Sequence, residues 1–236
     1  MWFESARTQE VESLAIYYHY CNEKFGLENI RKNRLKVAEI KDLNDPFEML
    51  CYSSTERELR KLAVHMRARV SEELGMLCFS KSLASPVQWA HYADKHRGMC
   101  LAFEIDESQL AEVKYKHGRI EFDLASYSKM LKRERHSYML DQLDIKSSEW
   151  KYEKESRQIV SLCDADFDVK KERYFLQFSD IGVLKKVFIG CNSTLTRKRL
   201  DRALTRGGGL GVATAKMRTA FKSYTMVVNK RADLWL

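Results

Sequence analysis

Apolar runs along the chain, some alternating with polar residues and some continuous, predict a series of β-strands. The strands are expected at residues 14–20, 36–40, 76–82, 99–105, 155–162, 174–178, 184–190, 212–217 and 223–229. Apolar residues spaced three and four positions apart predict helices at 25–35, 55–74, 124–150 and 194–206, because such residues share one helix face. Strands and helices mix without a strand–helix–strand rhythm. This pattern favours an α+β fold with a mixed, mostly antiparallel sheet core flanked by helices.

Both prolines of the chain stand where a helix is expected to begin. The pairs Asp45–Pro46 and Ser85–Pro86 combine a capping side chain with proline at the first helical position, where its missing N–H is not needed. Glu48 and Gln88 fall at the third helical position, which completes a capping box in each case. The sequence therefore predicts helices that begin at both prolines, with Gly98 ending the second.

Length and composition indicate one domain spanning residues 1–236, with 44% hydrophobic and 31% charged residues. No apolar run approaches the ~20 residues of a membrane span, and the N-terminus has no basic-then-apolar order. These features favour a cytoplasmic protein without membrane contact. The six cysteines occur singly, which predicts reduced thiols and no metal site.

Positive charge is concentrated in the C-terminal portion, residues 185–236. The formal net charge is +8, and residues 185–231 alone hold twelve Lys or Arg against one Asp. Arg199, Arg202 and Arg206 are expected on one face of the helix at 194–206, where they could bind the phosphates of nucleic acid. A solvated basic face is the alternative interpretation.

Residues 85–98, "SPVQWAHYADKHRG", gather many reactive side chains on one short helix. Trp89, Tyr92 and His96 share one side of it, and His91 and Asp94 share another. Trp89 is expected to be buried as an anchor between helix and sheet. Because buried polar groups need partners, Tyr92 or His91 is expected to point into a ligand site.

Glu153, Glu155 and Arg157 project to one side of an extended chain at the start of a predicted buried strand. One interpretation is a cross-strand ion network. The other is a carboxylate held ready to stabilise a developing positive charge.

Several motifs resemble, in order, a bacterial family catalogued as domain of unknown function 2971. They are "YYHY", "LKVAEIKDLNDPFE", "CFS", "PVQWAHYADKHRGMCLAF" and "WKYEKESR". The resemblance runs from about residue 17 to 162, within a family-like core at about 14–190. It implies a shared fold but no settled activity.

The order of features is also similar, more distantly, to NAD-dependent ADP-ribosyltransferases. Those enzymes carry a His or Arg on the first strand, an aromatic-Ser-x-Ser strand next, and Glu-x-Glu on a later strand. The corresponding residues here are His19, then Ser80 and Ser82, then Glu153 and Glu155.

This second resemblance implies an ADP-ribosyltransferase-like fold and NAD as substrate, with a toxin or antiviral defence role and nucleic acid or protein as acceptor. Glu155 would stabilise the oxocarbenium-like centre formed when nicotinamide leaves ribose. The other catalytic candidates are Glu153, His91 and Tyr92, and the cofactor-binding candidates are His19, Tyr20, Asn44, Ser80, Ser82 and Arg157. Arg157 would either pair with a phosphate or restrain Glu155.

Three alternatives stay open. The chain could be an NAD glycohydrolase, a nucleic-acid-binding or nuclease-type protein that uses His91, Asp94 and Glu153, or a module without catalysis. If the transferase interpretation holds, His19, Ser80, Tyr92 and Glu155 should line one cleft although they lie far apart in sequence.

Overall fold

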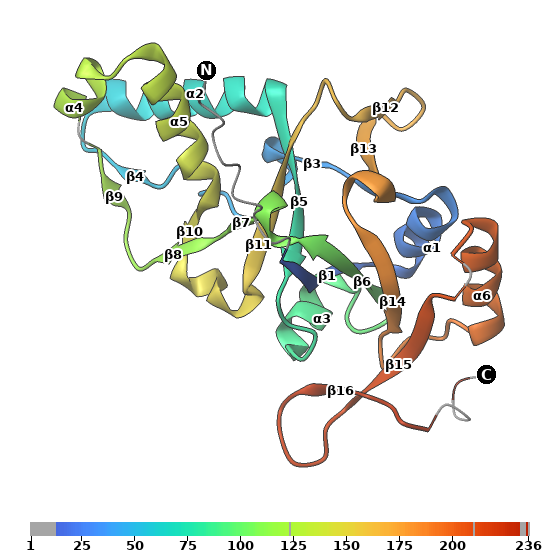
Figure 1. Ribbon diagram of the computed structural model, residues 1–236. Helices are drawn as coiled ribbons and strands as arrows, with labels where there is room; N and C mark the ends of the chain where they lie inside the picture. The colour runs from blue at the N-terminus through green and yellow to red at the C-terminus, as the bar shows by residue number, and fades with distance from the viewer. Residues whose placement is uncertain (1–12, 123, 210, 232–234, 236) are drawn as a thin grey trace, which may run out of the picture.

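The computed structural model describes residues 13–122, 124–209, 211–231 and 235, and its centre is one mixed sheet (Figure 1). Within this part of the chain the sheet has nine strands. Eight lie in the order β16 (Met226–Val228), β15 (Ala213–Thr219), β14 (Val183–Ile189), β6 (Met99–Asp106), β1 (Leu14–Cys21), β5 (Leu74–Ser80), β11 (Glu155–Ser161) and β7 (Ala111–Glu112), and β3 (Ala38–Glu39) also pairs with β5. Only the described pair β14–β15 is parallel. The predicted mixed, mostly antiparallel sheet flanked by helices is therefore confirmed.

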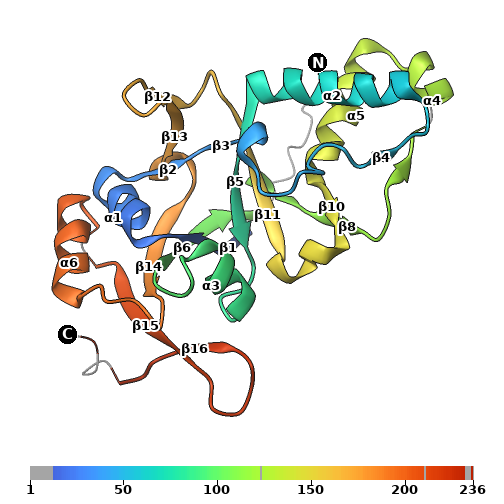
Figure 2. The same ribbon diagram turned by 180° about the vertical axis from the view of Figure 1, so that it is seen from behind.

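Helices cover both faces of the sheet. Helices α1 (Glu23–Lys32) and α6 (Arg197–Arg206) lie side by side (Figures 1 and 2), and their apolar side chains pack with Met99 and Leu101 of β6 in the largest core cluster. Cys100 of β6 points to the opposite face because side chains alternate along a strand. There it packs with Trp89 of α3 (Pro86–Tyr92). Trp89 is fully buried, as predicted.

Smaller elements surround this sheet. Helices α2 (Arg57–Glu73), α4 (Leu124–Lys129) and α5 (Lys132–Leu140) lie beyond the end of β5 (Figure 2). The remaining strands form a sheet of β12 (Asp166–Asp168), β13 (Arg173–Gln177) and β2 (Arg34–Lys36) and the pairs β4 (Tyr52–Ser53) with β9 (Ile120–Glu121) and β8 (Lys114–Lys116) with β10 (Ile145–Ser147). Short 3-10 helices are η1 (Ile40–Asp42), η2 (Glu107–Gln109), η3 (Asp141–Asp144), η4 (Ser148–Glu153) and η5 (Phe178–Asp180).

The main sheet splits between β1 and β5. Strand β1 pairs with β6 along all of its eight residues, and β5 pairs with β11 along all of its seven. Between β1 and β5, however, Tyr18 opposite Ser80 is the one aligned pair among the described residues. The two halves of the sheet therefore diverge from this point, which leaves room for side chains and for a cavity.

The two proline motifs have different outcomes. Ser85 caps α3 as predicted, because its hydroxyl accepts a hydrogen bond from Gln88 N–H at 3.3 Å and Pro86 is the first helical residue. The helix predicted at Pro46 is wrong. Residues 46–49 form a turn, in which Asp45 Oδ1 accepts from Phe47 N–H at 2.9 Å. The side chain of Glu48 is drawn away into the interior instead of completing a cap.

Gly98 does not directly end α3, which stops at Tyr92. The next residues turn through a left-handed conformation, with φ of 45° at Asp94 and 66° at His96. Gly98 then closes the turn by donating its N–H to Ala93 at 2.8 Å. Its backbone lies so close to β1 that an added Cβ would stand 2.2 Å from the carbonyl oxygen of Cys21. Glycine is therefore required here by this close approach.

The single helix predicted at 124–150 is also wrong. This segment forms α4, α5, η3, β10 and the start of η4. Strand β10 interrupts the helical pattern because it pairs in parallel with β8, with Lys146 opposite Tyr115. A tertiary pairing has overridden local helix propensity here, and it determines where Lys146 points.

Candidate functional site

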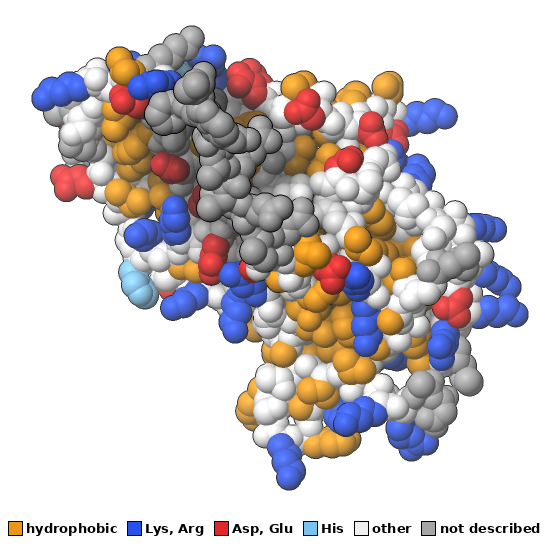
Figure 3. Space-filling model, in the orientation of Figure 1, with side chains coloured by type: hydrophobic (Ala, Val, Ile, Leu, Met, Phe, Trp, Pro, Cys, Tyr) orange, Lys and Arg blue, Asp and Glu red, His pale blue; other side chains and the backbone are white. Residues whose placement is uncertain are grey.

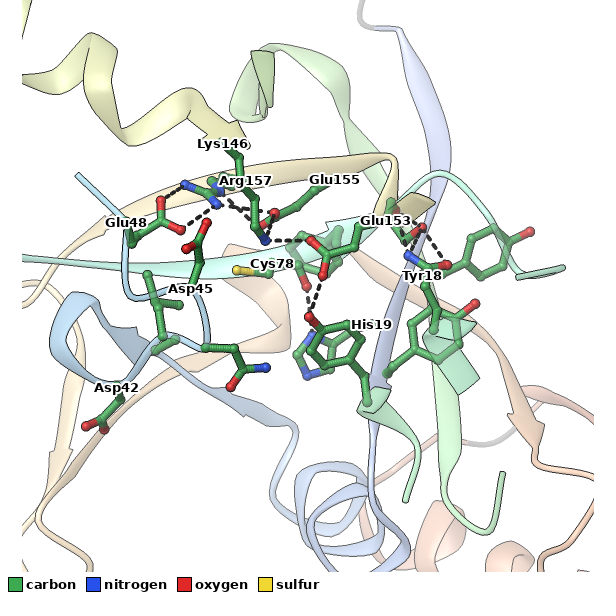
Figure 4. Close-up of a pocket in the computed structure, with 18 residues that line it drawn as sticks. Tyr18, His19, Asp42, Asp45, Glu48, Cys78, Lys146, Glu153, Glu155 and Arg157 are labelled. Carbon is green, nitrogen blue, oxygen red and sulfur yellow. Dashed lines mark hydrogen bonds and ion pairs between the residues drawn. The ribbon is translucent and has the colours of Figure 1, made fainter. Parts of the chain in front are cut away.

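A cavity of about 240 Å³ lies where the sheet splits between β1 and β5 (Figure 4). His19, Ser80, Tyr92 and Glu155 all line it, so the prediction that they share one cleft is confirmed. The other predicted site residues among its lining are Tyr20, Asn44, Glu153 and Arg157. The fold thus brings together side chains from five separate stretches of the sequence.

Arg157 is the centre of a buried ion network. Its side chain is 1% exposed, and all five of its N–H groups have acceptors. Nη1 and Nη2 donate to the carboxylate of Glu48 at 2.5 and 3.1 Å, and Nε and Nη2 donate to that of Glu155 at 2.9 and 3.2 Å. The fifth N–H reaches the carbonyl oxygen of Leu143. Arg157 has no N–H left for a phosphate, so it restrains Glu155, the second of its two predicted roles.

Glu155 is held ionised by two cations. Lys146 Nζ lies 2.8 Å from Glu155 Oε2, on the side away from the Nε contact of Arg157. Burial by itself would raise the pKa of Glu155, but Arg157 and Lys146 outweigh burial and lower it to about 2. Its backbone is fixed as well, since Glu155 N–H donates to the hydroxyl of Tyr115 at 2.9 Å. Glu155 therefore presents a fixed negative charge to the cavity.

Glu153 occupies a different electrostatic position, although Lys146 also contacts it, at 2.5 Å. Burial raises the pKa of Glu153, and Lys146 offsets this effect only in part. The hydroxyl of Tyr92 donates to Glu153 Oε1. Burial and this neighbouring carboxylate raise the pKa of Tyr92. Of the two neighbouring carboxylates, Glu153 is therefore the one that is protonated more readily.

His19 is neutral in this site. Its Nδ1 lies 3.1 Å from the carbonyl oxygen of Cys78, and because a carbonyl only accepts, Nδ1 carries the proton and Nε2 is the acceptor. Burial lowers the pKa of His19, while burial raises that of the Cys78 thiol well above its ordinary range. His19 can therefore accept a hydrogen bond from a ligand hydroxyl, and Cys78 remains a thiol.

Ser80 serves the architecture of the site. Its hydroxyl donates to the backbone oxygen of Glu153 at 2.6 Å and accepts from Ser82 N–H at 2.9 Å. Gln88 Nε2 also donates to the Glu153 oxygen, at 2.6 Å. Ser82 is not among the cavity-lining residues, and its carbonyl oxygen accepts from the hydroxyl of Tyr20 at 2.7 Å. These bonds fix the turn that carries Glu153. The hydroxyl of Ser80 is thus engaged within the protein, and Ser82 contributes backbone bonds from outside the cavity.

Sequence reasoning did not predict two members of the network, Glu48 and Lys146. Glu48 belongs to the motif "LNDPFE", where its spacing from Asp45 suggested a helix cap. Lys146 lay inside a predicted helix. The available signal was the burial of Glu153, Glu155 and Arg157, because two buried carboxylates beside one guanidinium require a further cation. Glu153 itself lies at the end of η4 and not on the predicted extended strand, which begins at Glu155.

The remaining predicted residues lie outside the cavity. His91 is exposed and its Nδ1 lies 3.0 Å from the hydroxyl of Tyr152. Asp94 is exposed and pairs with Arg97. The trio His91, Asp94 and Glu153 named for a nuclease is therefore not assembled, because only Glu153 lines the cavity. Among the described residues, no three or more His, Cys, Asp and Glu side chains are grouped so that they could hold a metal ion.

The arginines predicted on one face of α6 are exposed together, as expected. Arg202 and Arg206 line a shallow surface hollow with other α6 residues. Arg199 is also exposed, but its Nη1 pairs with Glu23 of α1 at 2.6 Å. In the part of the chain that the structure describes, no helix is long and apolar enough to cross a membrane.

Comparison with protein families gives one match. Residues 88–158 match the model described as "Protein of unknown function (DUF2971)", which supports the family resemblance over less than a third of the chain. The matched segment contains Tyr92, Lys146, Glu153, Glu155 and Arg157. Searches of curated proteins and of solved structures give no significant match.

Proposed function

We propose that this chain is an ADP-ribosyltransferase-like enzyme that binds NAD in the cavity at the split of the sheet and cleaves the bond between nicotinamide and ribose. The observation that carries the proposal is Glu155, an ionised carboxylate fixed on the cavity wall by Arg157 and Lys146. A fixed negative charge beside a reacting carbon lowers the barrier when positive charge develops there.

The charge of the cavity favours a positively charged group. Among the described lining residues, the carboxylates are Asp42, Asp45, Glu48, Glu153 and Glu155, against two cations, Lys146 and Arg157. Both cations are already paired with these carboxylates. The nicotinamide ring of NAD carries a positive charge, and its departure leaves an oxocarbenium-like ribose. The pyrophosphate is negative, so it is expected outside this acidic cavity.

The size of the cavity agrees with this division. Its 240 Å³ is below the roughly 300–1,000 Å³ of sites that enclose a drug-sized ligand. It suits one ring with its ribose rather than a whole dinucleotide. Tyr20 and Tyr92 line this space and can contact a flat ring.

The residues divide the chemistry between them. The carbon–nitrogen bond breaks with its electron pair going to the nicotinamide nitrogen, and Glu155 stabilises the ribose cation that remains. An acceptor oxygen or nitrogen then bonds to the ribose carbon, and its proton passes to Glu153, whose pKa is raised by burial. His19 Nε2 accepts a hydrogen bond from a ribose hydroxyl. Asn44 also lines the cavity, where its amide can hydrogen-bond the ligand.

Release of nicotinamide from NAD is the direct test, measured with no acceptor, with nucleic acid and with protein. Release that increases with an acceptor, together with label transfer from NAD, supports a transferase. Equal release without acceptor indicates a glycohydrolase. No release and no NAD binding by calorimetry under any of these conditions would refute the proposal.

Matched variants locate the activity. Glu155→Gln should lower nicotinamide release about 100-fold, the usual effect of removing one preorganised electrostatic group, while NAD binding remains measurable. Glu149→Gln is the control, because Glu149 is an exposed carboxylate on neighbouring η4 and does not line the cavity. Equal activity of both variants would place the chemistry elsewhere.

A further inference from the structure

The loop between β15 and β16 holds two aromatic rings in water. Phe221 is 89% exposed and Tyr224 is 99% exposed, the highest values among the large hydrophobic residues that the structure describes as exposed. Leaving such rings in solvent forfeits the free energy that their burial would supply. Exposed aromatic residues that lie together commonly mark a binding surface.

The loop is held in a defined shape. Ala220 N–H donates to the carbonyl oxygen of Thr225 at 2.9 Å, which closes a tip of four residues. The hydroxyls of Ser223 and Thr225 are bonded to each other at 2.7 Å. At the base of the tip, Met226 is buried. Its N–H donates to the carbonyl oxygen of Ala84 at 2.9 Å, and Ala84 lies just before α3. The rings are therefore presented outward by an anchored turn.

Positive charge surrounds the tip. Residues 212–231 contain five Lys or Arg and no Asp or Glu. The guanidinium of Arg218 lies 4.3 Å from the centre of the Phe221 ring, and Lys222 stands between the two aromatic residues in the chain. Figure 3 shows basic and hydrophobic side chains side by side at the lower end of the molecule, where this loop lies.

We propose that this tip binds single-stranded nucleic acid, with bases stacked on Phe221 and Tyr224 and with Arg218 and Lys222 contacting phosphates. Aromatic faces beside cations are the elements of sequence-tolerant single-strand binding. Paired bases are already stacked in a duplex, so single strands should bind more tightly. An anionic membrane is disfavoured because Lys222 and Ser223 separate the rings, and insertion of both rings would carry this polar pair into the bilayer.

The proposal is independent of any chemistry in the cavity. The loop is attached at Ala84, and α3, which begins two residues later, carries Tyr92 into the cavity. Nucleic acid bound at the tip would thus contact a loop that is hydrogen-bonded to the segment leading into α3, which forms one wall of the cavity. Its binding can be measured without NAD, so failure of one proposal does not decide the other.

Fluorescence anisotropy with a labelled oligothymidine of about 20 nucleotides tests the proposal, with a duplex of equal length in parallel. Phe221→Ala and Tyr224→Ala should each weaken single-strand binding by about ten-fold, because stacking of one base contributes roughly 1–3 kcal/mol. The control is Phe25→Ala, which removes another exposed ring, on α1. All three positions are exposed, so the melting temperatures should stay near that of the unchanged protein.

Salt dependence and a membrane arm complete the experiment. The affinity for the oligonucleotide should fall steeply as the salt concentration rises. Lys222→Gln should reduce the slope of log affinity against log salt concentration, because it removes one phosphate contact. The proposal is overturned if the unchanged protein fails to bind the oligonucleotide at low salt, or if both aromatic variants bind it normally. Equal affinity of the protein for the duplex and for the single strand would also overturn it. So would a result in which the aromatic variants lose binding to vesicles of phosphatidylserine and phosphatidylcholine but keep binding to the oligonucleotide.

Discussion

Replacing Glu48 with Gln tests whether the buried ion network holds the site together. Glu48 is 2% exposed, and its two oxygens accept from Arg157 at 2.5 and 3.1 Å. Gln keeps the shape but supplies one oxygen and an N–H₂ group in place of two oxygens. One guanidinium N–H would then face another donor in the protein interior, where no acceptor replaces the lost one.

The expected cost follows from this geometry. Removing one partner of a buried ion pair costs roughly 3–5 kcal/mol. Arg157 keeps its two bonds to Glu155, and burial already disfavours the charge on Glu48 by raising its pKa. Both facts place the destabilisation expected for Glu48→Gln at the lower end of this range, about 3 kcal/mol. For a chain of this length, this corresponds to a fall of about 10 °C in melting temperature.

Urea unfolding followed by circular dichroism measures this loss, and nicotinamide release at a temperature where the variant is folded measures its effect on Glu155. Glu149→Gln serves as the exposed control for both assays. We expect a clear loss of stability and a lower rate in Glu48→Gln alone. A stability within about 1 kcal/mol of the control, with normal release, would show that the Glu48–Arg157 pair neither stabilises the fold nor positions the carboxylate.

Three further predictions use other parts of the site. Tyr92→Phe removes the hydroxyl that donates to Glu153, so it should lower nicotinamide release about ten-fold, the effect of one lost hydrogen bond, and leave the melting temperature within a few degrees. His91→Gln, outside the cavity, should match the unchanged protein in both measurements, and the reverse result would contradict the assignment of the cavity. Ser85→Ala should cost about 1 kcal/mol in urea unfolding, because it removes the cap of α3, and an unchanged midpoint would argue against that cap. The pKa of Glu155 is lowered from 4.5 to about 2. Its contribution to folding stability, about 3 kcal/mol, is therefore present above pH 4.5 and lost as pH falls toward 2. Glu155→Gln should lack this part of the loss of stability in acid, and parallel curves of stability against pH for the variant and the unchanged protein would contradict it.

The long strands of the main sheet were predictable from sequence because their apolar patterns are local, whereas most of the short strands were not, and the strand predicted at 36–40 is β3 followed by η1. The runs at 76–82 and 99–105 correspond to β5 and β6, which lie in the middle of the sheet and pack apolar side chains on both faces. Ser85 was equally predictable, because a capping hydroxyl acts on an N–H only three residues away. In both cases the determining interactions are either close in sequence or require only that a run be buried.

The two proline motifs show where this local reasoning fails. Both have a capping residue, a proline and a Glu or Gln at the same spacing. The difference lies far away in the chain, because Glu48 binds Arg157, 109 residues later. A buried guanidinium attracts a carboxylate more strongly than a helix N-terminus does. The prediction at Pro46 therefore failed for an electrostatic reason that no local pattern contains.

Lys146 is a second residue whose role could not be predicted from local sequence, although the charge balance required a cation. The sequence placed Glu153, Glu155 and Arg157 on one side of the chain, which leaves two carboxylates against one cation. A second cation could come from any of the lysines and arginines elsewhere, and the parallel pairing of β10 with β8 selects Lys146. Lys146 bonds both carboxylates, whereas Arg157 bonds only Glu155, so Arg157 is what distinguishes them. Arg157 and Lys146 together lower the pKa of Glu155, while Lys146 alone only partly offsets the effect of burial on Glu153. The separate motifs "LNDPFE", "HYAD" and "KYEKESR" thus meet in one buried network, which lowers the pKa of one carboxylate while burial raises that of its neighbour.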